Sequence, residues 1–259
     1  MEYAALAVIA VMVSSLVVTL YQHRDSRLRA DYIAVIRAIR WWMIPAALAQ
    51  LATVALVMIL LLKIPVLQYG WWNLLGGQGN AALGQTGYSG SLWTAVSVAL
   101  PVMLFLALPA LALGEEELFR RHTEDDSHVR RAARQVGFGL MHLIVGVPLA
   151  AGLALTISGF YFMAVYLHAI RSTDHRAAKQ HLKQCIDQGA ELADTAHRAE
   201  QSLSEQLTQL KTWMNDVEDA ERDIDRVQRE PLLRAAAAHT VSNALVVLTL
   251  AIVLIVALL

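Results

Sequence analysis

The 259-residue chain contains a single cysteine, Cys185, and this scarcity limits its chemistry. One thiol cannot form a disulfide within the chain, and it cannot supply the several thiolates of a cysteine-rich metal site. The zinc-protease motif His-Glu-x-x-His is also absent. The formal net charge is only −1, so charge gives no indication of a nucleic-acid partner, and we predict none.

Charge is missing altogether from one long stretch, residues 64–114, which has no Asp, Glu, Lys or Arg. Over the whole chain 17% of residues are charged and 56% are apolar. Soluble proteins have about 25% charged and about 45–50% apolar residues. The composition therefore excludes a disordered protein and predicts a membrane protein.

A helix needs about 20 mostly apolar residues to cross the bilayer, because each residue adds about 1.5 Å and the hydrocarbon core is about 30 Å thick. Four segments meet this requirement: 3–21, 41–62, 91–113 and 235–259. A fifth run, 135–170, is too long for one span, and Gly146, Pro148 and Gly152 in its middle predict a turn. We therefore expect an all-α polytopic bundle of six transmembrane helices.

Arginine and lysine indicate the orientation of this bundle, because basic residues concentrate on the cytoplasmic side. They cluster in the link 22–40, in the link after the third span and in residues 171–234. Six alternating spans place all three clusters on one side, whereas five would separate them. We expect that side to be cytoplasmic, with both termini outside. This topology, without an obvious organelle address, favours a bacterial inner membrane.

The polar segment 171–230 separates the first five spans (1–170) from the last (231–259). As a single helix it would extend about 80–90 Å, yet both of its ends must return to one membrane surface, so we expect a cytoplasmic helical hairpin. Gly189 and the pair Asn215–Asp216 are the candidate turn positions.

Five apolar residues of this segment follow a heptad-like spacing: Leu203, Leu207, Leu210, Met214 and Val217. We call this set the heptad stripe. The simpler interpretation, which we favour, is that it packs the two hairpin helices on each other. The alternative is that it binds a partner protein or a second copy of the chain. Cys185 is expected to be a small core residue of the hairpin.

Ionisable side chains inside spans are costly and are functional candidates. Glu115, Glu116 and Glu117 lie at the cytoplasmic end of the third span, and Arg120 follows Glu116 by four residues, which places it on the same helical face. These glutamates alone would fit a solvated helix end.

Two histidines are expected at a similar depth on other helices. His142 lies about two turns into the fourth span, His239 about one turn into the sixth, and Asn243 one turn deeper. A carboxylate can act as general base on water, an imidazole can orient that water, and imidazole or amide donors can stabilise an oxyanion. The set predicts a hydrolase that uses a glutamate and a water molecule. Taken singly, His142 fits a backbone-bonded histidine, and His239 and Asn243 fit polar contacts between helices.

Three motifs in this order resemble those of the CPBP family of intramembrane glutamate proteases (CAAX proteases and bacteriocin-processing enzymes), whose pattern is EExxxR, FxxxH and HxxxN. They are Glu115-Glu116-Glu117-Leu118-Phe119-Arg120, Phe138-Gly139-Leu140-Met141-His142 and His239-Thr240-Val241-Ser242-Asn243. The resemblance covers about residues 100–170 and 230–250.

The resemblance implies an endopeptidase that cleaves a membrane-associated peptide or protein near the cytoplasmic face, without a cofactor or metal. It implies these roles: Glu115 as water-activating base, Glu116 as its partner, Arg120 as support, His142 sharing the water, and His239 with Asn243 as the oxyanion site. A shifted register, Glu116–Glu117 with Arg121, also satisfies the spacing. The chain departs from the family in having Arg121 where a glycine is usual, and in the long insertion before the last helix.

One alternative is excluded and two stay open. Gly87-Tyr88-Ser89-Gly90 resembles the rhomboid serine-protease motif, but the charge topology places Ser89 on the side opposite His142, so these two side chains cannot form a hydrogen-bonded pair. A glutamate and two histidines could ligate a metal, although Asn243 is a poor zinc ligand. Finally, the chain could be a non-catalytic adaptor, or a degenerate protease relative, whose insertion binds a partner.

Overall fold

The computed structural model describes residues 2–22, 24–75, 87–171, 175–198 and 203–258. Helices make up the regular structure of these ranges, which contain no strand, so the all-α prediction is confirmed. The chain divides into two compact units. The first, the bundle unit, comprises Met1–Tyr166 and Leu232–Leu259, and the second, the insertion unit, comprises Leu167–Pro231. The boundaries taken from the sequence lie at 170/171 and 230/231.

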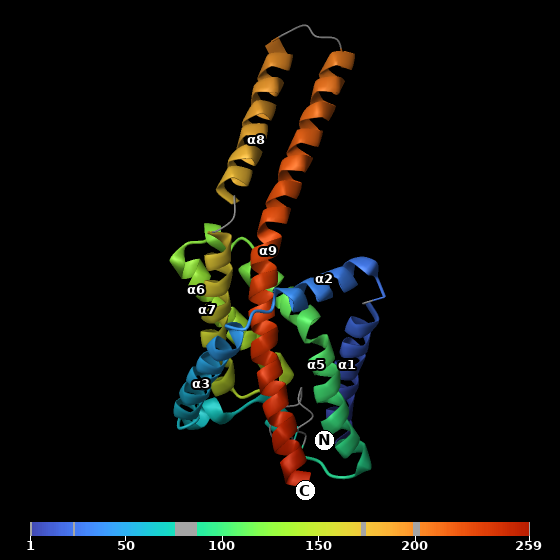
Figure 1. The fold of residues 1–259 in the computed structure, drawn as a ribbon, viewed down its shortest axis with the longest axis vertical. Coiled ribbons are helices and arrows are strands. Elements are labelled where there is room, and N and C mark those ends of the chain that lie inside the picture. The colour runs from blue at the N-terminus through green and yellow to red at the C-terminus, as the bar shows by residue number, and fades with distance from the viewer. Residues whose placement is uncertain (1, 23, 76–86, 172–174, 199–202, 259) are drawn as a thin grey trace. The chain divides into compact units, whose positions relative to one another are not determined.

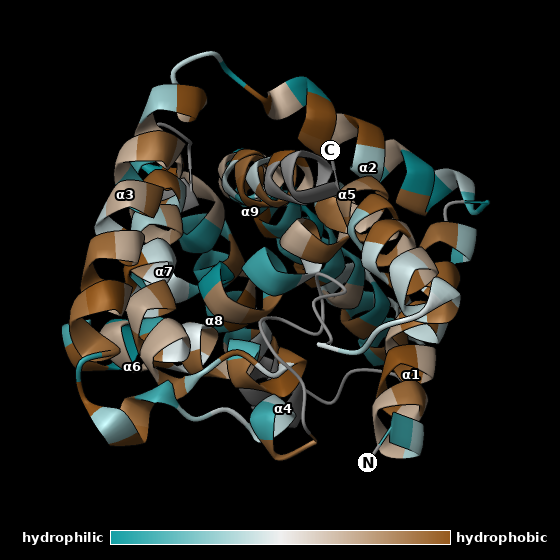
Figure 2. Cartoon of the chain, turned by 90° about the horizontal axis from the view of Figure 1, so that it is seen from below, coloured by the Kyte–Doolittle hydropathy of each residue, from teal (hydrophilic) through white to brown (hydrophobic). Residues whose placement is uncertain are grey.

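Five helices are long and apolar enough to cross a membrane. They are α1 (Glu2–Gln22), α3 (Met43–Leu61), α5 (Ser91–Arg120), α7 (Leu149–Ile170) and α9 (Leu203–Leu258). By this criterion the chain is a membrane protein, as its composition predicts. Apolar residues cover the surfaces of α1 and α3 (Figure 2), where side chains such as Val11 and Leu56 are more than half exposed.

The predicted sixth span is not among these five helices. The run 135–170 does break where the sequence predicts, since α6 (His128–Met141) is followed by a 3-10 turn (His142–Val145), Gly146 at a positive φ of 86° and Pro148. However, α6 has only 14 residues, or about 21 Å at about 1.5 Å per residue. Its first turns are charged, because the helix begins at His128 and not at Gln135.

The turn around Gly146 packs against the chain that follows α3. The indole Nε1 of Trp71 donates to the Leu143 carbonyl at 2.6 Å, and the N–H of Leu149 donates to the Tyr69 carbonyl at 3.1 Å. A Cβ on Gly146 would lie 2.8 Å from Cβ of Trp72, so a larger residue would push this contact apart. The end of α6 therefore reaches the same end of the bundle unit as the end of α3.

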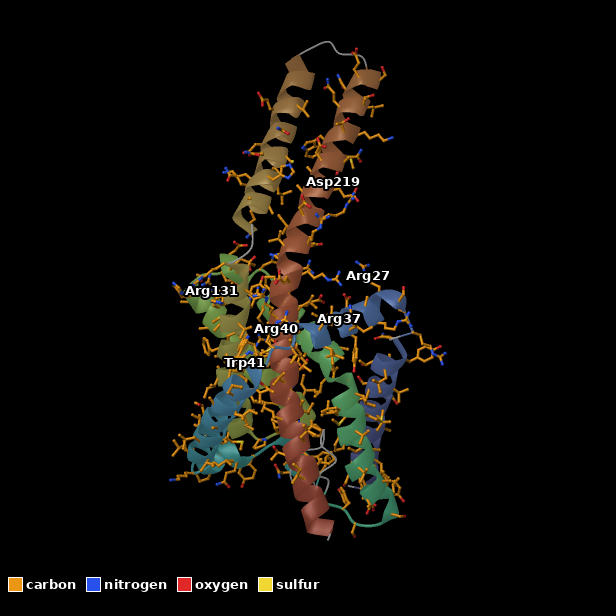
Figure 3. The ribbon with its side chains drawn as sticks, viewed as in Figure 1. Arg27, Arg37, Arg40, Trp41, Arg131 and Asp219 are labelled. Atoms are coloured by element: carbon orange, nitrogen blue, oxygen red, sulfur yellow. The ribbon has the colours of Figure 1, made fainter. Side chains whose placement is uncertain are left out.

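The basic residues of the bundle unit lie at the other end. Figure 3 shows Arg27, Arg37 and Arg40, along and after α2 (Ser26–Ala38), at the same end as Arg131 on α6. In Figure 1 the start of α1 and the end of α9 both lie at the end away from α2, and Figure 2 shows that they are apart within that end.

The insertion unit contains α8 (His175–Arg198) and the first part of α9. Both predicted turn positions are wrong, because Gly189 lies inside α8 and Asn215–Asp216 lies inside α9. The connection between these helices includes residues 199–202, outside the described residues. The two helices contact each other where Trp213 Nε1 donates to the Cys185 carbonyl at 2.7 Å, and Cys185 is buried as predicted.

The heptad stripe does not form this contact. Leu207, Leu210 and Met214 are 56%, 49% and 57% exposed, and the Leu203 side chain lies outside the described residues. The favoured interpretation, in which the stripe packs the two helices together, is therefore wrong for these three residues. Trp213, Ala220 and Ile224 are on the more buried face instead.

Candidate functional site

The carboxylates of the site come from α5, which continues through the glutamate run to Arg120 instead of ending before it. Glu116 and Arg120 are one helical turn apart and form an ion pair, with 3.2 Å between Oε2 and Nε. Both side chains are 0% exposed. A solvated helix end therefore does not describe Glu116, although it does describe Glu117, which is exposed.

His239 of α9 joins this pair. Its Nδ1 lies 2.9 Å from Oε1 of Glu116, and its Nε2 lies 3.7 Å from Oε2 of Glu115. The imidazole is 1% exposed. Four buried alanines, 235–238, precede His239, and such small side chains let helices approach closely. The sequence thus brings the last helix close enough to α5 for a direct hydrogen bond.

His142 lies where α6 ends, and its Nδ1 is 2.9 Å from the Phe138 carbonyl. Because a carbonyl can only accept, Nδ1 carries the proton, and in the neutral ring Nε2 is left as an acceptor. The ring of Phe138 contacts both histidines, with centroids 4.9 Å from His142 and 5.5 Å from His239. Glu115 and His239 are both near enough to act electrostatically on His142.

Aromatic rings enclose the arginine. The Arg120 guanidinium carbon lies 4.1 Å from the centroid of Phe138 and 5.6 Å from that of Phe162, distances typical of cation–π contacts. Phe162 also stacks on His239, with centroids 4.3 Å apart and planes at 22°. Nη2 of Arg120 donates to the Gly159 carbonyl at 3.3 Å. The site is thus held from α5, α6, α7 and α9.

The contribution of α7 does not follow from the three motifs. Phe162 and Gly159 belong to none of the three motifs, and Phe162 is one apolar residue within a long apolar run. One signal was available: Gly152 and Gly159 are two turns apart on one face of α7, which indicates close helix packing there. A Cβ on Gly159 would lie 3.1 Å from Cδ1 of Phe138.

Asn243 is the predicted site residue that joins this network least. It is half-buried, one turn beyond His239, and its side chain makes no hydrogen bond within the part of the chain described here.

The two possible registers of the glutamate motif also differ in their contacts. Glu115 and Glu116 both contact His239, whereas Glu117 is exposed, so the geometry favours Glu115–Glu116 with Arg120.

A cavity of about 670 Å³ opens beside Glu115. It is bounded by α1, α2, α5 and Met141 at the end of α6, and Arg27 and Asp31 of α2 line it together with Glu115 and Glu117. Glu115 is 26% exposed, in contrast to the fully buried Glu116. It therefore lies between the cavity and His239, where water and a larger ligand can reach it.

Several buried polar atoms at the site retain hydrogen-bonding capacity. Within the described residues, Oε2 of Glu115, Oε2 of Glu116, and Nε and Nη1 of Arg120 have no hydrogen-bond partner of suitable geometry. The Glu116–Arg120 contact is thus an ion pair by distance but not an aligned hydrogen bond. A buried polar site with spare donors and acceptors can bind a water molecule or a polar group of a ligand.

The other predicted chemistries fit the geometry less well. Ser89 precedes the start of α5, whereas Glu116 lies near the opposite end of that helix, so Ser89 is far from His239. As to the metal alternative, the described residues hold one group of three possible ligand atoms within 4.8 Å, namely His122, Glu124 and Asp125. The glutamates and histidines of the site do not form such a group.

Comparison with known proteins adds no further constraint. No family model matches this chain, and neither the curated proteins nor the solved structures give a match.

Proposed function

We propose that the protein is an intramembrane endopeptidase in which a glutamate-activated water cleaves a membrane-associated peptide or protein. The observation that carries the proposal is the contact of His239 with both Glu115 and Glu116 in a buried site beside a cavity. These residues belong to two of the motifs that resemble the CPBP family. The proposal extends that resemblance to function.

In the proposed reaction Glu115 is the general base, because it lines the cavity and also contacts His239. It takes a proton from water as the water oxygen attacks the peptide carbonyl, and the carbonyl becomes a tetrahedral oxyanion. His142, with Nε2 as acceptor, orients the water. The proton then passes to the amine as the carbon–nitrogen bond breaks.

His239 and Asn243 are the proposed oxyanion donors. In this scheme Nδ1 of His239 donates to Glu116, and the opposite ring nitrogen, Nε2, donates to the developing negative charge. Glu116 and Arg120 are positioning residues in this scheme, because their buried contacts hold the imidazole in place.

The experiment compares cleavage of candidate membrane-associated peptides by purified wild-type protein with cleavage by Glu115→Gln and His239→Ala. We expect both variants to lose activity, since a general base contributes about 10²–10⁴-fold in rate. Glu221→Gln is the matched control, the same chemical change at an exposed position of the insertion unit, and it should retain cleavage. Equal cleavage by the wild type and both site variants would contradict the proposal.

We further propose that α6 and the turn after it re-enter the membrane from the basic end, so that six segments alternate with the basic links and the insertion facing the cytoplasm. The contacts of the turn with Tyr69 and Trp71 support this arrangement. Two variants are made in a Cys185→Ser background, one with Arg130→Cys and one with Lys63→Cys. Their cysteines should react with an impermeant maleimide from opposite sides of the membrane. Labelling of both positions from one side would contradict the arrangement.

A second candidate function is favoured by the heptad stripe, whose exposed leucines and methionine are available to a partner helix. The insertion would then recruit a protein or a second copy of the chain. Leu207→Asn with Leu210→Asn should abolish that association in a cross-linking assay in membranes, with cleavage retained. If the cellular function of the protein survives Glu115→Gln but is lost in the stripe variant Leu207→Asn/Leu210→Asn, the adaptor function is favoured over the protease.

A further inference from the structure

The cavity beside Glu115 has two kinds of wall. Its polar wall carries three carboxylates, Asp31, Glu115 and Glu117, and one guanidinium, Arg27. Three negative charges and one positive charge give a formal net charge of −2. Leu111 of α5 and Met141 at the end of α6 contribute to the apolar part of the lining.

The charge of this lining differs from that of the surrounding links. The link after α1 and the segment around the start of α6 are rich in arginine, including Arg29, Arg37, Arg130 and Arg134. A lining with excess negative charge at the basic end of the bundle unit therefore selects for a positive group, while phosphates and carboxylates would be repelled by the three carboxylates.

We propose that this cavity is the substrate subsite and that it binds the side chain of a lysine or arginine carried on an apolar peptide segment, next to the bond that is cleaved. The inference rests on the proposed function, because Glu115 is at once a wall of the cavity and the base. A basic side chain fits both walls, since its methylene stem packs on apolar surface while its charged head reaches polar groups. The cavity volume of about 670 Å³ is within the range of ligand sites.

Binding can be measured separately from cleavage. Three fluorescent peptides share one apolar sequence and carry Lys, Gln or Glu at a single position. Their affinity for the protein in phosphatidylcholine nanodiscs is measured by fluorescence anisotropy, and the signal from empty nanodiscs is subtracted. We expect the Lys peptide to bind about tenfold more tightly than the Glu peptide, which corresponds to about 1.4 kcal/mol. The difference should shrink as salt is raised, because partly exposed charges are screened.

Asp31→Asn combined with Glu117→Gln removes two cavity charges without touching the proposed base. This variant should reduce the preference for the Lys peptide to about twofold or less, since it removes two of the three carboxylate charges that attract the Lys peptide and repel the Glu peptide. Asp216→Asn combined with Glu221→Gln, at two exposed positions of the insertion unit, removes the same number of charges and should keep the tenfold preference. Equal binding of the Lys and Glu peptides to the wild type, or an unchanged preference in the double variant, would overturn the inference.

Two further measurements distinguish this inference from lipid binding in the cavity and from the proposed function. If ethanolamine lipids added to the nanodisc displace the Lys peptide, the cavity belongs to a lipid headgroup and the peptide assignment is wrong. Cleavage of the same peptides is measured in parallel, and His239→Ala should keep the binding preference while losing cleavage. Cleavage without a preference for the Lys peptide overturns this inference alone, whereas a preference for the Lys peptide without cleavage by the wild type overturns the proposed function alone.

Discussion

Nδ1 of His239 lies 2.9 Å from Oε1 of Glu116, although 123 positions separate the two residues in the chain. The insertion unit lies between them in sequence and contributes no atom to this contact. Since Glu116 also pairs with Arg120, the last helix is tied to α5 through a charged group with no exposed surface. A buried ion pair of this kind is costly to break, because removal of one partner leaves an uncompensated charge.

Neutralising Glu116 should therefore destabilise the bundle strongly. Glu116→Gln leaves the Arg120 guanidinium buried without its carboxylate, and such a loss typically costs about 3–5 kcal/mol. Thermal unfolding of the purified protein in detergent measures the change. Glu117→Gln makes the same chemical change at an exposed position and should stay within about 0.5 kcal/mol of the wild type.

A double-variant cycle shows whether the loss belongs to the pair. Glu116→Gln with Arg120→Gln removes both charges, so the double variant should be more stable than the sum of the single variants by about 0.5–3 kcal/mol. Additive effects would mean that Glu116 and Arg120 act independently, contrary to their 3.2 Å contact.

The spans were predictable because the bilayer imposes a simple requirement, an apolar run of sufficient length, and the sequence displays such runs openly. α1 and α3 differ from their predicted bounds by only one or two residues. The turn near Gly146 was predictable for a similar local reason, since Gly and Pro end helices wherever they cluster. The count of six was not, because the charged residues from His128 onward continue in the same helix and leave α6 short of a full span.

The contacts between helices were less predictable. The three motifs identified Glu116, Arg120 and His239, whose chemistry is distinctive, but not Phe162, which is one apolar residue among many in α7. In the insertion, heptad spacing indicated an apolar face but not the helix that covers it. The contact with α8 is made by Trp213 and not by Leu210, because Gly189 has no side chain and the large indole packs directly on its backbone.

The contact of α6 with α7 depends on a glycine inside the second motif. A Cβ on Gly139 would lie 2.7 Å from the Thr156 backbone nitrogen and still closer to the Gly152 carbonyl, so Gly139→Ala forces the two helices apart. We expect a loss of about 1–3 kcal/mol from overpacking, measured as thermal unfolding. Phe138 directly precedes Gly139 and His142 follows the last residue of α6, so cleavage should fall as well.

Gly137→Ala is the matched control for this prediction. Its Cβ would meet only Cε1 of Phe119 at 3.7 Å, an ordinary van der Waals distance, and alanine favours the helix. This variant should be as stable as the wild type or slightly more stable. Equal stability of Gly139→Ala and Gly137→Ala would show that α6 and α7 are not closely packed.

The insertion can be probed through the single thiol of the chain. A Cβ on Gly189 would overlap the ring of Trp213, so Gly189→Ala should displace the indole and break its hydrogen bond to the Cys185 carbonyl. Cys185 is 4% exposed, and opening of the contact should increase its rate of maleimide labelling several-fold. Ala190→Ser changes an exposed neighbour and should leave the rate unchanged; equal rates in both variants would argue against the contact.

Asn243 distinguishes a functional site from polar contacts that merely hold helices together. If Asn243 served as a structural link, its loss would lower stability, as expected for Gln50 of α3, whose side-chain amide donates to Oγ of Ser158 on α7 at 2.6 Å. The half-buried Asn243 side chain has no such bond among the described residues. Asn243→Ala should therefore change the free energy of unfolding by less than about 0.5 kcal/mol.

The rate of cleavage, unlike the stability, should change strongly in Asn243→Ala. Loss of one oxyanion donor typically lowers kcat by about 10²–10³-fold, so Asn243→Ala should be a stable but slow enzyme with nearly unchanged KM. Ser242→Ala is the adjacent control and should keep its kcat, because the hydroxyl of Ser242 donates to the Ala238 carbonyl of its own helix at 3.1 Å. A variant Asn243→Ala that unfolds earlier yet cleaves at the wild-type rate would reverse the assignment: the amide would then link helices, and the oxyanion would depend on His239 alone.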